Sequence, residues 1–140
     1  MEIFLAVESD GMTLVDLQVA LAEQDAVARR HKTVFVLDRE HAGVADAAQA
    51  RKEFEVVKAV RRAVGDSIEI FVDYNNGYTP AKAIDLTKKL TEHFNIAAIE
   101  EPVSYHNYAG LNAVVQAVDI PVMAGEHEFN KWQKSLEEKL

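Results

Sequence analysis

The sequence contains no cysteine, and it has only three prolines and six glycines among its 140 residues. The absence of cysteine excludes disulfide bonds and thiolate chemistry. No apolar run approaches the roughly 18 residues that a membrane-spanning helix needs, so we expect no membrane partner. The first residues also lack the basic stretch and apolar core of a secretory signal peptide, which makes a cytoplasmic location our expectation.

A basic excess is also missing. Fifteen Lys and Arg residues stand against 23 Asp and Glu residues, and the net charge is −8. Nucleic-acid binding depends on clustered basic side chains that neutralise phosphates. The short basic runs "ARRHK", "VKAVRR" and "LTKKL" are typical of solvated helix faces. We therefore expect no nucleic-acid partner.

The remaining composition is that of one globular domain over residues 1–140, with 49% hydrophobic and 27% charged residues. Short runs rich in Val, Ile and Phe alternate with longer amphipathic runs, which predicts an α/β fold of about five βα units with a parallel sheet. The five strands are expected at Glu2–Val7, Thr33–Asp38, Ile68–Tyr74, Ile96–Pro102 and Ile120–Glu126.

Apolar stripes at helical spacing predict the helices between and after these strands. One stripe follows Thr13, and another ends at Gly65, a residue type that commonly ends helices. A third begins at Thr79, which is followed by a proline suited to the first helical turn. The last begins at Phe129 and forms a C-terminal helix over residues 130–140.

Three of the predicted strands end on carboxylates, at Asp73, Glu100 and Glu126. The spacings are 27 and 26 residues, about one βα unit each. Ligands bind at the carboxyl ends of parallel strands, and neighbouring strands lie about 5 Å apart. Three ionised carboxylates so close would repel one another unless a cation lay among them. Oxygen ligands alone favour Mg²⁺, or Mn²⁺, over zinc.

Two further residues are expected to support these ligands. Asn75 lies two residues beyond Asp73 and has an amide that can reach the metal ligands. Glu101 alternates away from Glu100 and is expected to form an ion pair behind it. An alternative for each acid, as a helix cap or a solvated loop residue, remains open at this point.

The segments "VVKAVRRAVGDSIEIFVDYNNGYTPAKAIDLTKKL", "IAAIEEPV" and "IPVMAGEHEF" together resemble the barrel domain of the mandelate racemase and muconate lactonizing branch of the enolase superfamily. The resemblance covers residues 51–129, whereas residues 1–50 form divergent first units. The "GEHEF" segment is most similar to the acid-sugar dehydratases of that branch. The fold implied by the resemblance is a TIM-type barrel of eight strands, of which this chain holds about five.

The resemblance implies a function as well. It assigns Asp73, Glu100 and Glu126 as ligands of Mg²⁺, which binds the carboxylate of a small acid or an acid sugar. The implied reaction is removal of the proton next to that carboxylate, as in a racemase, an isomerase or a dehydrating lyase. The chain departs from the family at the K-x-K base of the second strand, where "TVFVLDREH" stands instead. His127, directly after Glu126, is the candidate replacement base.

These observations lead to three hypotheses on function. The first is a fragment, or an engineered or structural domain, that keeps the Mg²⁺ ligands without catalysis. The second is an active Mg²⁺-dependent lyase or isomerase. The third is a receiver-like phosphoacceptor module that uses Glu8, Asp10 and Asp73, although Glu126 stands where that class needs a lysine.

The sequence is compatible with two alternative folds. A partial barrel would leave open sheet edges, through which two copies could form a homodimer. A rearranged open sheet of the flavodoxin type would also fit five βα units, and the phosphoacceptor hypothesis depends on it.

Overall fold

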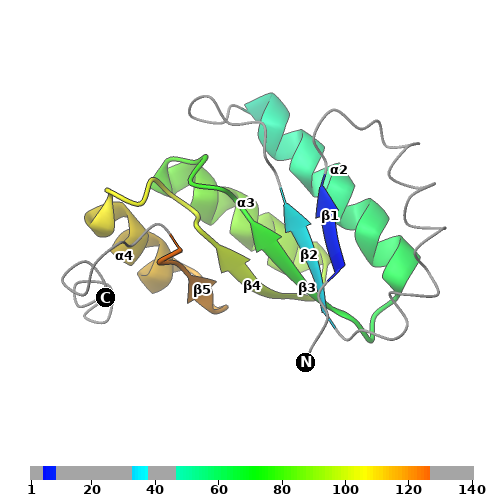
Figure 1. The fold of residues 1–140 in the computed structure, drawn as a ribbon. Helices are drawn as coiled ribbons and strands as arrows, with labels where there is room; N and C mark the ends of the chain where they lie inside the picture. Colours follow the sequence, from blue (N-terminus) through cyan, green and yellow to red (C-terminus); the bar gives the residue numbers. More distant parts are fainter. Residues whose placement is uncertain (1–4, 9–32, 38–46, 127–140) are drawn as a thin grey trace.

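The computed structural model describes residues 5–8, 33–37 and 47–126 (Figure 1). The elements are β1 (Leu5–Glu8), β2 (Thr33–Leu37), α2 (Ala47–Val64), β3 (Glu69–Asp73), α3 (Pro80–His93), β4 (Ile96–Glu100), α4 (Tyr108–Ala117) and β5 (Val122–Met123). Each strand overlaps a predicted strand, and the last is much shorter than predicted. The helices predicted after Thr13 and Phe129 lie outside the described residues. Within the described ranges, no helix is long and apolar enough to cross a bilayer.

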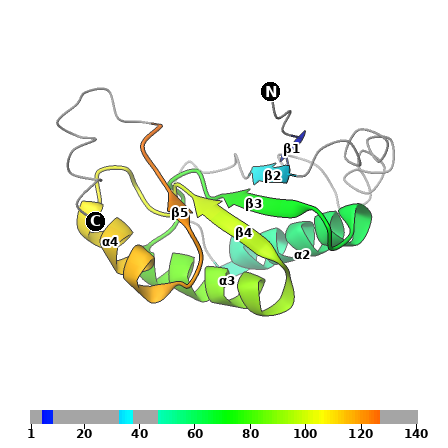
Figure 2. The ribbon, with the colours of Figure 1, turned by 90° about the horizontal axis from the view of Figure 1, so that it is seen from below.

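The five strands are all parallel, and their spatial order is β1-β2-β3-β4-β5. Helices α2, α3 and α4 all lie on the same face of the sheet (Figure 2). Successive right-handed crossovers that step in one direction place every helix on one face, as in the wall of a barrel.

The alternative of an open flavodoxin-like sheet is therefore wrong. That fold has the order 2-1-3-4-5, which puts the first strand beside the third. Here β1 pairs with β2, and β2 separates it from β3. The phosphoacceptor hypothesis depends on that fold, and Glu8 at the end of β1 and Asp73 at the end of β3 are not on adjacent strands.

The hydrophobic core lies between this sheet and its helices. Ile70 and Val72 alternate along β3 and are almost fully buried, at 0% and 1% exposure. They join Val57 and Val60 of α2 and Leu90 of α3 in one buried cluster. Each such side chain contributes about 1.5–3 kcal/mol on burial, so this layer contributes substantially to the stability of the described fold.

The ends of α2 and α3 follow the sequence prediction in part. Gly65 has φ +76°, and its N–H donates to the carbonyl of Arg61 at 3.0 Å, which confirms it as the residue that ends α2. Pro80 occupies the first turn of α3, also as predicted. Thr79 precedes it in the capping position, although its side chain caps no backbone N–H in the described part of the chain.

Arg61 links the amino ends of two strands. Its Nη1 donates to the carbonyls of Gly65 at 2.5 Å and Ile68 at 2.7 Å, and its Nη2 donates to the carbonyl of Asn95. Ile68 directly precedes β3, and Asn95 directly precedes β4. One buried guanidinium therefore holds the end of the sheet opposite the strand-end acids.

Candidate metal site at the strand ends

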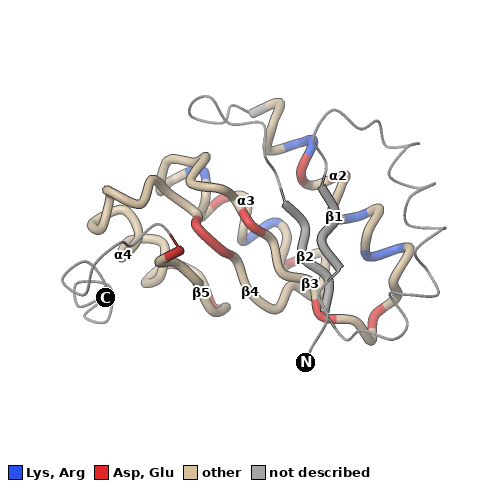
Figure 3. The backbone as a smooth tube through the Cα atoms, viewed as in Figure 1, with Lys and Arg blue, Asp and Glu red and all other residues tan. Residues whose placement is uncertain are grey.

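The sheet register brings two of the three predicted ligands together. Asp73, the last residue of β3, is the register partner of Glu100, the last residue of β4. Glu126 lies in the turn that follows β5, three residues beyond Met123, which is the partner of Glu100. Acidic segments accordingly lie at the ends of β3 and β4 and just beyond β5 (Figure 3). The third acid is thus on a connecting segment, because β5 ends earlier than predicted.

The turn after β3 fixes the carboxylate of Asp73. Asp73 is 5% exposed, and its Oδ1 accepts a hydrogen bond from the backbone N–H of Asn75 at 2.8 Å. Asn75 and Asn76 have φ values of 46° and 62°, a left-handed conformation that asparagine tolerates well. Asn75 therefore supports Asp73 through its main-chain amide, whereas the sequence predicts support from its side-chain amide.

Tyr74 anchors the same turn from the core side of the sheet. Its ring is fully buried, and its hydroxyl lies 3.1 Å from Oγ1 of Thr87. The ring packs edge-on against that of Tyr78, with 5.1 Å between the ring centroids. Burial raises the pKa of the Tyr74 hydroxyl far above its ordinary value, so the group stays neutral. Tyr74 is thus a packing residue rather than a reactive one.

Glu100 experiences the negative charge of its neighbours. Partial burial raises the pKa of its carboxyl, and the charges of Asp73, Glu126 and Glu101 raise it further, in that order. The three other acids are therefore close enough to act on Glu100. A cation among them would remove the repulsion that raises this pKa.

A pH-dependent stability follows from this shift. A carboxyl whose pKa is higher in the folded than in the unfolded state binds its proton more tightly when folded. The stability gain is present when Glu100 is protonated and is lost as the pH rises through the raised pKa. In metal-free buffer, we expect Glu100→Gln to have a higher urea midpoint than the parent at about pH 7, with the difference shrinking on acidification through the carboxylate range.

The matched control for that measurement is Glu92→Gln, a change at an exposed position on α3. Its urea midpoint should follow that of the parent at every pH. A lower midpoint for Glu100→Gln than for the parent at neutral pH would contradict the predicted repulsion.

The fit of this site to a divalent cation can be judged from its donors. Asp73 and Glu100 offer carboxylate oxygens side by side, which suits Mg²⁺ or Mn²⁺. Glu126 is exposed, and among the described residues no group of three or more acid or imidazole side chains is already arranged to hold a metal ion. The donor chemistry and the strand-end placement fit the cation, and the exposed side chain of Glu126 would have to turn towards the other two carboxylates.

In the part of the chain that the structure describes, Glu101 does not form the ion pair that the sequence predicts. It is 2% exposed and forms no ion pair within the described ranges. Instead, its Oε1 accepts hydrogen bonds from the backbone N–H groups of Gly125 at 2.8 Å and Glu126 at 3.3 Å. The buried carboxylate therefore supports the segment that bears the third predicted ligand.

Strand β2, which pairs with β3, carries no candidate base in its described residues. The register pairs Phe35 with Phe71 and Leu37 with Asp73, so an apolar residue of β2 lies next to the first ligand. His127, the candidate replacement base, lies outside the described residues.

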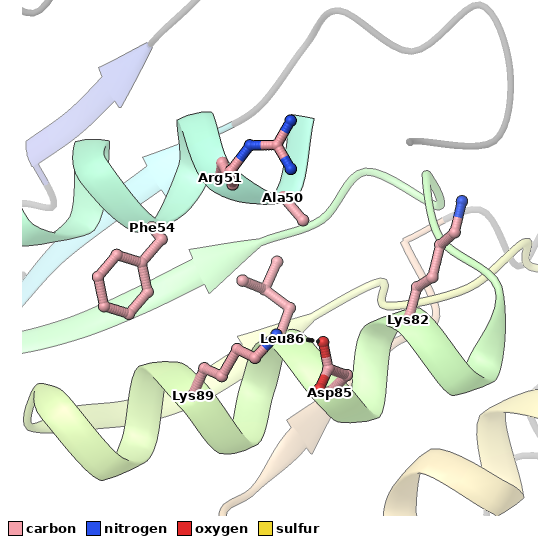
Figure 4. Close-up of a pocket in the computed structure, with 7 residues that line it drawn as sticks. All are labelled: Ala50, Arg51, Phe54, Lys82, Asp85, Leu86 and Lys89. Atoms are coloured by element: carbon pink, nitrogen blue, oxygen red, sulfur yellow. Dashed lines mark hydrogen bonds and ion pairs between the residues drawn. The ribbon is translucent and has the colours of Figure 1, made fainter. Parts of the chain in front are cut away.

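A separate cavity of about 220 Å³ lies between α2 and α3 (Figure 4). Arg51 and Phe54 of α2 line it from one side, and Lys82 and Lys89 of α3 from the other. Lys89 is paired with Asp85 at 2.7 Å. None of the three predicted ligands lines this cavity, so it is distinct from the strand-end site.

Comparisons with known proteins agree with this geometry. The family described as Enolase C-terminal domain-like matches residues 17–135. The D-Ala-D/L-Ala epimerase of Cytophaga hutchinsonii is 36% identical over 126 residues, covering 79% of this chain and 34% of that protein. The arabinonate dehydratase of Saccharolobus solfataricus is 31% identical over 83 residues, covering 59% of this chain and 22% of that protein.

A solved structure gives the same fold. A racemase from Streptomyces coelicolor A3(2), whose structure contains bound magnesium, superposes with a TM-score of 0.81 over 99% of this chain and 38% of that one, at 18% identity. The chain spans about a third of the length of the epimerase that it matches. It belongs to the enolase superfamily, as part of the C-terminal barrel domain of the mandelate racemase and muconate lactonizing branch.

Proposed function

We propose that this chain binds Mg²⁺ or Mn²⁺ through Asp73, Glu100 and Glu126 without being catalytic by itself. The observation that carries the proposal is the pairing of Asp73 with Glu100 at one end of adjacent strands, where partial burial and then the neighbouring acids raise the pKa of Glu100. Such an excess of negative charge is best relieved by a hard cation with oxygen ligands. The magnesium in the structure of the Streptomyces coelicolor racemase supports the choice of metal.

The chemistry of this site would be electrostatic. A divalent cation held there would act as a Lewis acid towards the carboxylate of a small acid or acid sugar. Asp73 and Glu100 would bind the cation, and the buried turn around Tyr74 would keep Asp73 in place. Proton removal needs a base within hydrogen-bonding reach, and the β2 residue in register with Asp73 is Leu37. We therefore propose binding without turnover.

Titration calorimetry with Mg²⁺ and with Mn²⁺ at low ionic strength tests the binding site. We expect saturable binding to the parent and at least about tenfold weaker binding to Glu100→Gln, because the variant loses a charged ligand. Glu92→Gln, which changes the net charge by the same amount on the exposed surface of α3, should bind like the parent. Equal binding by all three proteins, or none by the parent, would refute the proposed site.

The relatives favour a second candidate function, α-proton exchange on a small carboxylate. One relative is a dipeptide epimerase and another a sugar-acid dehydratase. The test is to incubate the chain with Mg²⁺ in D₂O, with Ala-Ala dipeptides or sugar acids, and to follow deuterium incorporation by NMR. Exchange that disappears in His127→Ala would support an active enzyme with His127 as its base. A parent without exchange would exclude it for these substrates.

A further inference from the structure

We propose that Glu101 is a positioning residue, which holds the segment after β5 so that Glu126 lies within reach of Asp73 and Glu100. The inference deepens the proposed function and rests on it for the role of Glu126 as a ligand. The position of that segment relative to β4 is a separate matter, which can be measured without any metal.

The side chain of Glu101 connects the ends of two strands. It follows the last residue of β4, and its Oε1 accepts from the N–H groups of Gly125 and Glu126, which lie beyond β5. Hydrogen bonds from backbone amides to a carboxylate are about twice as strong as those between neutral groups. Because one of the two donors is the amide of Glu126 itself, the contact acts directly on the third ligand.

The backbone of Glu101 extends the connection to β3. Its N–H donates to the carbonyl of Met123 at 2.9 Å, and its carbonyl accepts from the N–H of Asn76 at 2.7 Å. Asn76 belongs to the turn that fixes Asp73. A single residue thus joins the segments that carry all three predicted ligands.

The conformation of Glu101 is unfavourable by itself. Its φ is +43°, in the left-handed region that side chains other than glycine and asparagine rarely adopt. The following Pro102 normally pushes the preceding residue towards extended backbone. Such a conformation persists only where surrounding contacts determine it, and such residues cluster at functional sites.

The charge of Glu101 offers a competing explanation, because it also raises the pKa of Glu100. Two variants separate charge from position. Glu101→Gln removes the charge and keeps an acceptor oxygen at the same reach. Glu101→Asp keeps the charge and withdraws the acceptor by one methylene group.

The experiment measures amide hydrogen exchange of Gly125 and Glu126 by NMR in metal-free protein, together with Mn²⁺ affinity by calorimetry. In Glu101→Ala and Glu101→Asp, we expect both amides to exchange about tenfold faster and Mn²⁺ binding to weaken about tenfold, since a hydrogen bond near 1.4 kcal/mol corresponds to that factor. Glu101→Gln should stay within about threefold of the parent in both measurements. The exposed variant Glu92→Ala serves as the control.

Each contrary result has a definite meaning. Unchanged exchange of Gly125 and Glu126 in Glu101→Asp would overturn the positioning role, even if Glu101→Ala failed to fold. Equal losses in Glu101→Gln and Glu101→Asp would also overturn it and assign the effect to charge. If exchange changes as expected while the parent binds no Mn²⁺, the proposed cation site fails and the positioning of the Glu126 segment stands.

Discussion

Arg61→Ala is expected to lower the free energy of unfolding by about 2–3 kcal/mol. The buried carbonyl of Ile68 loses its donor, which alone costs about 1–3 kcal/mol, and the exposed residues Gly65 and Asn95 lose hydrogen bonds from a charged group that water replaces only in part. Arg61 is 8% exposed, and its guanidinium is shared by the carbonyls of Gly65, Ile68 and Asn95. These carbonyls lie at the end of α2 and just before β3 and β4. Urea unfolding followed by circular dichroism measures the loss.

Arg62→Ala is the matched control for this prediction. Arg62 follows Arg61 on the same helix and is exposed. Its removal should change the free energy of unfolding by less than about 0.5 kcal/mol, as is usual for surface positions. Similar losses in the two variants would show that helix α2, rather than the guanidinium contacts, is being weakened.

Tyr74→Ala is expected to be comparably damaging, with a loss of about 3–5 kcal/mol, the usual cost of removing a buried aromatic ring. Tyr74→Phe should cost only about 1 kcal/mol, because it keeps the ring and removes one hydrogen bond to Thr87. The same urea measurement distinguishes these values. Tyr105→Ala, at a position 37% exposed in the β4–α4 connection, should cost clearly less than Tyr74→Ala.

A consequence for the metal site tests whether packing and binding are coupled. Tyr74 directly follows Asp73, and the turn that it anchors fixes the carboxylate of Asp73. Tyr74→Phe should therefore leave Mg²⁺ affinity nearly unchanged. A large loss of affinity in this variant would mean that the hydroxyl takes part in the site, contrary to its burial against Thr87.

The strand positions could be predicted because apolar runs and their βα spacing are local properties of the sequence. Strand order could not, because the same five units satisfy either a barrel wall or a flavodoxin-like sheet. The order depends on which side of the growing sheet each crossover takes. The register shift between Ile70 and Phe71, where β3 pairs with β4, also could not be predicted from hydrophobic periodicity. It is a property of the pairing of two strands rather than of either strand alone.

The candidate site, like the fold, could be predicted only in part. Asp73 and Glu100 end regular strands, and the βα period places them side by side. Glu126 follows a strand of only two residues, so its position depends on the segment beyond the sheet. The contacts of Glu101 could not be predicted, because an acid next to Pro102 gives no indication of its positive φ or of two amide donors 24 and 25 residues away.

The sequential strand order also determines how this sheet can assemble. Asp73 and Glu100 are register partners only 27 residues apart, so each pairing closes a short stretch of chain at a modest entropic cost. A chain that emerges from the ribosome with its N-terminus first can add each βα unit to the edge left by the previous one. Asp73 and Glu100 would then pair when β4 is added, and Glu126 would join them last, when β5 arrives and Glu101 accepts from the amides of Gly125 and Glu126. Earlier stages of folding would thus proceed without the full repulsion that raises the pKa of Glu100.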